Sequence, residues 1–255
     1  MIDTSVTRAM SILELLVVNR SPMTVAEIAK KLEINRATVY NLLGSMVAKG
    51  YVTRMENGKC GLTSRIFEMG TIYQNSFPVV HLFKRADLSF ADVIPSTVKL
   101  AVLSSNEAAI ILHSRSTVST PEVLPIGFTM PLHTSAIGKT LLAYSPRSTV
   151  DHVLGGAELK KFTTATMTDK EELRRELEEV KKRGLAYDRG EYADNLFCLA
   201  APVFEKNHDI AAAVSVSGTP EQINAHLPAL REGLVQVTRE LSLSLGASIH
   251  ELMRL

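Results

Sequence analysis

Residues 24–50 read TVAEIAKKLEINRATVYNLLGSMVAKG, and this stretch decides the fold of the N-terminal part of the chain. Thr24 followed by Glu27 has the spacing of a capping box, which marks the start of a helix. A second helical pattern begins a few residues later, with Asn35 as a good N-cap and Gly50 as its stop. Two helices joined by so short a turn are typical of a helix-turn-helix.

Short elements on either side complete a winged form of this motif. The preceding segment predicts a helix whose buried face recurs at intervals of three and four residues: Val6, Ala9, Met10, Leu13 and Leu16. After the second helix, residues 51–54 and 60–63 form two short extended runs, with Asn57-Gly58 between them. Both residues tolerate the positive φ of a tight turn, so we expect a hairpin.

The polar face of the second helix predicts base and phosphate contacts in the major groove of DNA. Arg36 can pair with guanine or phosphate and Asn41 with adenine, while the small side chains between them can touch a thymine methyl group. Tyr40 is expected to reach a phosphate, and Lys59 to add affinity from the wing tip. The expected DNA contacts are Arg8, Thr24, Asn35, Arg36, Ala37, Thr38, Tyr40, Asn41, Asn57 and Lys59. The alternative is a winged helix that contacts only proteins.

Charge supports the first interpretation. Residues 1–75 hold nine Lys and Arg against six Asp and Glu, whereas residues 76–255 hold nineteen against twenty-one. The composition, 45% hydrophobic and 22% charged over 255 residues, is that of a globular protein with one large or two ordinary domains. Two cysteines make no disulfide framework, and no run reaches the roughly 20 apolar residues of a membrane span, so we expect a cytoplasmic protein.

The rest of the chain predicts an α+β body, because strands and helices mix without a regular βαβ repeat. Thr168 followed by Glu171 has the capping-box spacing for one of the helices. We expect strands at residues 97–103, 108–114, 199–204 and 210–217, and helices at 63–75, 82–93, 168–184 and around 230–245.

Four strings then resemble the IclR family of bacterial transcriptional regulators. They are VTRAMSIL at residues 6–13, MPLHTSAIGK at 130–139, DNLFCLAAPVF at 194–204 and AVSVSG at 213–218. The resemblance implies a winged helix-turn-helix at 1–62, a linker helix at 63–76 and a GAF-like effector-binding domain at 77–255. It also implies dimers, often paired into tetramers, on a near-palindromic operator. The chain is then expected to be a ligand-responsive regulator, a repressor of a catabolic operon.

The same resemblance implies an effector pocket lined by Ala136, Ile137, Asp188, Cys198, Ser215 and Ser217. The two serines are two residues apart and so face one side of a strand. Ser135, or Thr134, can cap the helix after it and leave free amides for the carboxylate of a small organic acid. Asp188 would repel such an anion unless it is protonated or accepts a ligand hydroxyl, which indicates a hydroxylated acid.

Each of these pocket residues also has a purely structural interpretation. Cys198 can be a small buried apolar residue, the serines can bond to backbone, and Asp188 can pair with an arginine. The chain departs from the family pattern at Arg189-Gly190 and at residues 195–197, which makes the effector of any one relative an unsafe guide.

Enzymatic alternatives find less support. Gly138-Lys139-Thr140 is similar to the end of a P-loop, but His133 stands where that motif requires glycine. Ser135 near His133 has no identifiable orienting acid, so His133 is expected to have a structural hydrogen bond. We expect no catalytic residue, no metal site and no cofactor. The rival from another class is an enzyme-like sensory domain that turns over its small-acid ligand.

Overall fold

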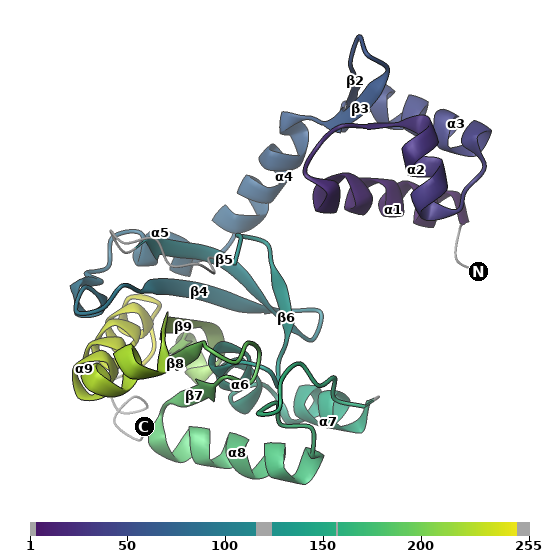
Figure 1. Ribbon diagram of the computed structural model, residues 1–255. Coiled ribbons are helices and arrows are strands. Elements are labelled where there is room, and N and C mark those ends of the chain that lie inside the picture. Colours follow the sequence, from purple (N-terminus) through teal and green to yellow (C-terminus); the bar gives the residue numbers. More distant parts are fainter. Residues whose placement is uncertain (1–3, 116–123, 157, 249–255) are drawn as a thin grey trace. The chain divides into compact units, whose positions relative to one another are not determined.

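The computed structural model describes residues 4–115, 124–156 and 158–248. The chain divides into two compact units, Met1–Tyr73 and Gln74–Leu255 (Figure 1). Among the described residues no helix is both long and apolar enough to cross a bilayer. The finer division at residues 62 and 76 stays a prediction.

The first unit is the expected winged helix-turn-helix. Its elements are α1 (Thr4–Asn19), β1 (Met23–Thr24), α2 (Val25–Leu32), α3 (Arg36–Ala48), β2 (Val52–Arg54), β3 (Lys59–Leu62) and α4 (Ser64–Asn75). The three strands form an antiparallel sheet in the order β1-β3-β2. Its core is built by fully buried side chains from α1, α2 and α3: Ile12, Ile28, Val39 and Leu43.

The expected hairpin is present, because β2 pairs antiparallel with β3, and the expected buried face of α1 was wrong in part. Helix α1 buries Ile12 and Leu16, whereas Val6 and Met10 are 55% and 53% exposed. A helix with apolar residues on more than one side gives a periodicity that does not say which side meets the core. In the wing turn Gly58 has positive φ (75°) and Asn57 does not, and the Asn57 side-chain oxygen accepts the Lys59 N–H at 3.1 Å.

The second unit is built on a six-stranded antiparallel sheet in the order β6-β5-β4-β9-β8-β7. The strands are β4 (Thr97–Ser104), β5 (Glu107–Arg115), β6 (Thr129–Pro131), β7 (Ala186–Arg189), β8 (Phe197–Phe204) and β9 (Ile210–Gly218). The helices are α5 (Pro78–Phe83), η1 (Ser89–Ala91), α6 (Ala136–Ala143), α7 (Arg147–Gly155), α8 (Lys170–Arg183), η2 (Lys206–His208) and α9 (Pro220–Ser244). The expected α+β architecture is therefore confirmed.

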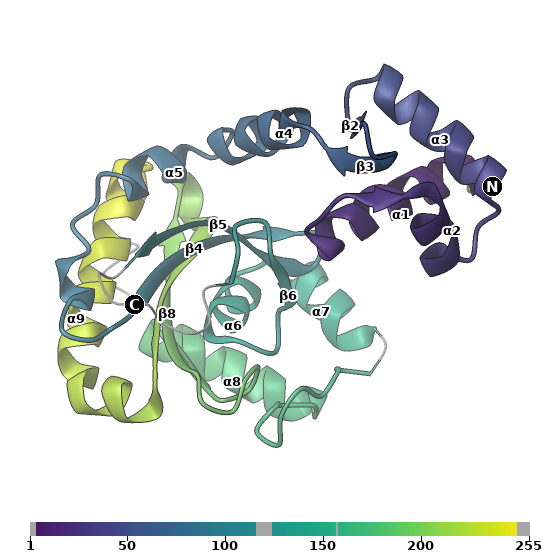
Figure 2. The same cartoon turned by 45° about the horizontal axis from the view of Figure 1, so that its top comes forward.

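Helices cover both faces of this sheet. Apolar residues of α5 and α9 pack on one face, and those of α6 and α8 pack on the other (Figure 2). Alternation along β9 assigns Val214 and Val216 to the α9 face, and Ser215 with Ser217 to the opposite face. The polar strand residues that are predicted to bind the effector thus lie on the face covered by α6.

Two expected helices of this unit begin or end elsewhere. The predicted helix at 82–93 is the short α5 followed by the single 3-10 turn η1. Helix α8 is capped by Asp169, whose side chain accepts the Glu172 N–H at 2.7 Å, one residue later than the predicted Thr168 cap. Asp is as good an N-cap as Thr, so the sequence alone does not decide which of these two adjacent residues caps the helix.

Candidate DNA-binding surface and effector site

Local capping positions the two helices of the helix-turn-helix. The Thr24 hydroxyl accepts the Glu27 N–H at 3.3 Å while the Glu27 carboxylate accepts the Thr24 N–H at 2.7 Å, so the expected capping box is present. Asn35 accepts the Ala37 N–H at 2.8 Å and starts α3 at the expected residue. Thr24 and Asn35 thus have structural roles, and their DNA contacts stay predictions.

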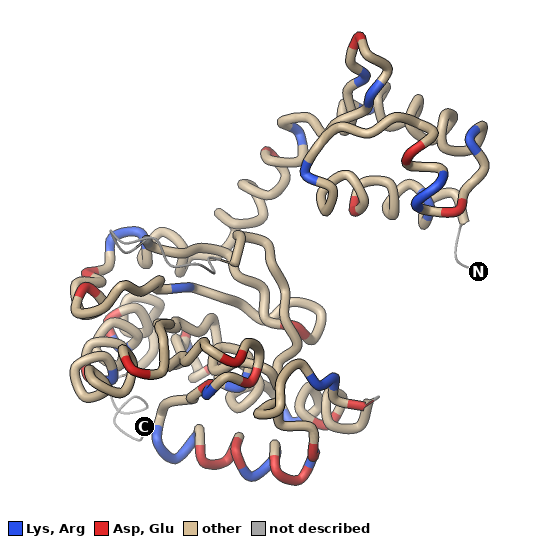
Figure 3. Tube along the Cα trace, in the orientation of Figure 1, with Lys and Arg blue, Asp and Glu red and all other residues tan. Residues whose placement is uncertain are grey.

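The face of α3 opposite its core residues is open to solvent. Val39, Leu43 and Met46 are buried, whereas Arg36, Ala37, Tyr40 and Asn41 are exposed and Thr38 is half-buried. Figure 3 shows basic residues at the start of α3 and in the β2–β3 hairpin. The arrangement leaves donors and small methyl groups where a major groove can be read.

The wing brings a further basic residue to this surface. Arg54 of β2 lies over the Tyr40 ring with its guanidinium carbon 4.7 Å from the ring centroid. A hydrogen bond with Tyr40 raises the pKa of Arg54, whose guanidinium is charged in any case. Exposed Asn57 and half-buried Lys59 follow it in the hairpin. Sequence reasoning missed Arg54 because only the fold places it against α3.

In the second unit, neighbouring strands place three of the predicted effector residues in one row. Asp188 of β7 is paired with Cys198 of β8, and Cys198 is paired with Ser217 of β9. Ser215 lies two residues from Ser217 on the same face, paired with Ala200. All four are buried. The structure therefore brings these four predicted residues together on the face covered by α6.

The other three predicted residues start α6. The Ser135 hydroxyl accepts the Gly138 N–H at 3.1 Å, which confirms it as the N-cap, and Ala136 and Ile137 are buried in the first turn. A side chain at Gly138 would begin 2.5 Å from the Leu132 carbonyl oxygen, so this turn packs directly on backbone. This close approach explains why glycine is required at position 138 without any role in phosphate binding.

A buried ion pair connects α6 to the end of β7. The Lys139 ammonium is 2.6 Å from a Glu191 carboxylate oxygen and 3.7 Å from Glu176. The Glu191 N–H in turn donates to the Asp188 carboxylate at 2.7 Å. Burial raises the pKa of Glu191, an effect that Lys139 opposes. Lys139 therefore has a structural partner, and His133 likewise bonds through Nε2 to the Lys160 carbonyl at 3.0 Å, as expected.

Burial also sets the protonation of two row residues. It raises the pKa of Asp188 from 3.8 to about 7, so this carboxyl can hold a proton near neutral pH. It raises the pKa of the Cys198 thiol to about 12, which keeps the thiol protonated. Among the described residues Asp188 forms no arginine ion pair, so the structural interpretation considered for it is not supported.

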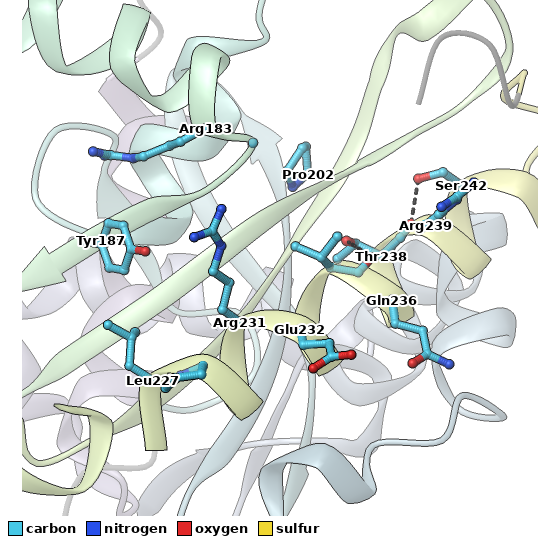
Figure 4. Close-up of a pocket in the computed structure, with 13 residues that line it drawn as sticks. Arg183, Tyr187, Pro202, Leu227, Arg231, Glu232, Gln236, Thr238, Arg239 and Ser242 are labelled. Carbon is cyan, nitrogen blue, oxygen red and sulfur yellow. Dashed lines mark hydrogen bonds between the residues drawn. The ribbon is translucent and has the colours of Figure 1, made fainter. Parts of the chain in front are cut away.

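Two concavities border this part of the sheet. A groove of about 710 Å³ lies between α9 and the β7–β8 edge, with Arg183, Tyr187 and Arg231 at one end and Arg239 at the other (Figure 4). Its described lining includes none of the seven predicted effector residues. A smaller pocket of about 140 Å³ is lined by Asp188 and Cys198 together with residues of α9. The smaller pocket reaches Asp188 and Cys198 from the α9 side, and its described lining includes no residue of α6 and neither Ser215 nor Ser217.

Two family models match the chain. The model described as the C-terminal part of the bacterial transcriptional regulator IclR matches residues 73–243, and that of the IclR helix-turn-helix domain matches residues 5–56. The chain belongs to the IclR family. As an IclR-family member it is a DNA-binding transcriptional regulator whose C-terminal domain binds a ligand.

Similar IclR proteins span nearly the full length. The transcriptional repressor IclR of Escherichia coli (strain K12) is 28% identical over 249 residues, which are 95% of this chain and 90% of the relative. The crystal structure of Thermotoga maritima IclR has a TM-score of 0.73 at 28% identity and covers 93% of this chain and 98% of its own. An IclR homologue of Microbacterium hydrocarbonoxydans, crystallised with 4-hydroxybenzoate, has a TM-score of 0.75 at 23% identity, covers 94% of this chain and 100% of its own, and shows the fold alone.

Proposed function

We propose that this IclR-family chain is a repressor of a catabolic operon that releases, or tightens on, a near-palindromic operator when a small hydroxylated organic acid binds. One observation carries the proposal. The chain joins a solvent-exposed polar face on α3 to a buried polar row of Asp188, Cys198 and Ser217 in a separate unit. A ligand that stabilises one arrangement of the two units by a few kcal/mol is sufficient to change occupancy of the operator.

The DNA contacts divide into two kinds. Arg36, Ala37, Thr38 and Asn41 are proposed to read base edges because they lie on the open side of α3. Phosphate contacts are proposed for the remaining exposed or half-buried positions around it, where a side chain adds affinity without reading sequence: Arg8, Thr24, Asn35, Tyr40, Asn57 and Lys59.

The effector is proposed to bind between α6 and the polar row. The first turn of α6 offers backbone N–H groups and the positive end of a helix dipole to a carboxylate, next to the Ser135 cap. Ser215 and Asp188 offer hydrogen bonds to a hydroxyl group of the ligand, and Ser217 lies beside them in the same row. Because the pKa of Asp188 is raised to about 7, its carboxyl can lie near an anion without full repulsion.

Self-association is proposed through α4 and the open side of α1. None of the twelve residues of α4, all of them described, is buried in the chain, and Phe67 and Ile72 are 78% and 65% exposed. Val6 and Met10 of α1 add further exposed apolar surface. These exposed apolar side chains are proposed to be covered by a second copy of the chain. A symmetric dimer can place two copies of α3 about 34 Å apart, one turn of DNA.

Effector binding without turnover is the favoured mode of the second unit. A cysteine nucleophile acts as its thiolate, and the raised pKa of Cys198 keeps that thiol neutral. The regulator is proposed to act in the cytoplasm, where bacterial operator DNA lies.

The test combines DNA binding with an acid panel. Fluorescence anisotropy on labelled DNA from upstream of the chain's own gene should give salt-dependent, sequence-specific binding, and at least one small hydroxy acid should change its Kd tenfold. Chromatography of the same mixture should return the acid unchanged. Binding equal to that of scrambled DNA, or an acid consumed over time, contradicts the proposal.

A further inference from the structure

Lys99 is a buried lysine that was not among the predicted effector residues. It lies in β4, a central strand, paired with Ser215 of β9 on one side and His113 of β5 on the other. The surrounding sequence TVKLAV at residues 97–102 is otherwise uncharged, and Lys99 is only 5% exposed. Alternation along β4 puts Val98 and Leu100 in the α9-side core and Lys99 on the face of Ser217.

The hydrogen bonding of Lys99 differs from that of the other buried lysine. Its ammonium donates to the Ser217 hydroxyl at 2.8 Å. Within the described ranges no Asp or Glu oxygen lies within 4.0 Å of it, whereas Lys139 has carboxylate oxygens at 2.6 and 3.7 Å. An ammonium has three donors, and a buried charge is costly unless it is paired. Lys139 is thus neutralised by the fold, and Lys99 is held by a neutral hydroxyl.

The position of Lys99 places this charge next to the predicted ligand contacts. Ser217 links it to the row, because Ser217 is paired with Thr97 on β4 and with Cys198 on β8. Cys198 is therefore the strand neighbour of the residue that the Lys99 ammonium contacts. A carboxylate bound here would accept from the Lys99 ammonium. It would also accept from the Ser217 hydroxyl in place of that hydroxyl's present acceptor, the Thr97 carbonyl oxygen at 3.4 Å.

We infer that Lys99 and Ser217 form an anion-binding pair that fixes the carboxylate of the effector, so the regulator responds to acids and rejects their neutral amides. This inference deepens the proposed function and depends on it for the location of the site. The amides at the start of α6 contribute dipoles, whereas Lys99 contributes a full charge in a buried setting. The preference of the site for a charged ligand is therefore attributed to Lys99 on β4, a strand that contains none of the predicted effector residues.

The experiment compares acids with their amides on three variants of the full chain. The probes are glycolate, D-gluconate and 4-hydroxybenzoate, each beside its amide, with binding read by thermal shift and calorimetry. Wild type should bind at least one acid tenfold more tightly than the matched amide. Lys99→Met should lose the preference for acid over amide and should bind the acid at least tenfold more weakly. Lys99→Arg should keep most of the acid affinity. Ser217→Ala should weaken acid binding severalfold.

A matched control separates ligand binding from structure. Without ligand, Lys99→Met should melt at or above the wild-type temperature, because it removes a buried charge without a counter-ion. Lys139→Met should melt lower, because it leaves Glu191 unpaired. The inference fails if Lys99→Met binds acids like wild type, if it melts as low as Lys139→Met, or if no wild-type acid is preferred over its amide. An unchanged Lys99→Met leaves the proposed function standing, whereas a wild type that binds upstream DNA and responds to no acid rejects the proposed effector class.

Discussion

The two units of this chain expose and bury their functional side chains in opposite ways. On α3 the candidate contacts Arg36, Tyr40 and Asn41 are exposed, whereas Asp188 and Ser217 of the second unit are almost fully buried. Exposed positive charges suit the binding of DNA, because its phosphates attract them electrostatically. Buried polar groups suit a small ligand, because desolvation makes each unpaired group expensive and each correct partner specific.

This contrast predicts that substitutions of equal chemistry have unequal costs in the two settings. Removing an exposed charge should change binding and leave stability alone. Removing a buried one should change stability first. The four substitutions that follow test this difference, starting with the one expected to have the largest effect.

Glu191→Ala should destabilise the second unit by about 3 kcal/mol, because it leaves the Lys139 ammonium buried with only Glu176 at 3.7 Å. Urea unfolding followed by circular dichroism measures the loss. Glu178→Ala breaks the exposed pair with Lys181 and should cost less than about 0.5 kcal/mol. Equal losses for the two variants would remove the distinction between buried and exposed pairs.

Asp188→Asn should flatten the dependence of stability on pH. The pKa of Asp188 is about 7 in the folded chain and 3.8 ordinarily, so between these values the folded state holds one proton more than the unfolded state. Wild-type stability should therefore fall as pH rises through this window, by up to about 1.4 kcal/mol per pH unit from this group. Asn keeps an oxygen for the Glu191 N–H. Parallel wild-type and variant curves between pH 5 and 7 would contradict the raised pKa.

Arg36→Ala should abolish preference for the cognate operator, a loss of about 1 to 2 kcal/mol relative to scrambled DNA. Its melting temperature should not change, because the side chain is exposed. Lys59→Ala is the comparison: it should weaken all sequences about equally and reduce the salt slope by about one. Anisotropy titrations at several salt concentrations distinguish the two. If both variants bind like wild type, α3 and the wing are not the DNA surface.

Arg54→Ala should have the smallest effect. The loss of its contact with Tyr40 is expected to weaken DNA binding less than about fivefold for every sequence, since an exposed cation–π pair contributes about 0.5 to 1 kcal/mol. Arg54→Lys keeps the charge but not the planar guanidinium, so its affinity for DNA should lie between those of wild type and Arg54→Ala. A sequence-dependent effect of Arg54→Ala would instead assign it to base reading.

The sequence predicted best what is decided locally. The caps at Thr24, Asn35 and Ser135 depend on residues two or three positions apart, and all three are present. The long strands of the second unit were predicted within two residues because their apolar runs are continuous. These features need no knowledge of the rest of the chain.

What the sequence did not predict depends on partners far along the chain. Strands β6 and β7 are only three and four residues long and exist because β5 and β8 pair with them. The buried side of α1 is selected by packing, not by its own periodicity. The contact between Lys99 and Ser217 depends on the pairing of β4 with β9, which the sequence does not reveal.

The most direct measurement is the ratio of Kd values for upstream DNA with and without the acid that stabilises the chain, compared between wild type and Ser217→Ala. At an acid concentration that just saturates wild type, we predict a ratio of at least tenfold in wild type and a clearly smaller ratio in Ser217→Ala. The two proteins should have equal affinities for DNA when no acid is present. A variant that keeps the wild-type ratio, or that loses DNA binding without any acid, would show that the buried row does not control the exposed helix.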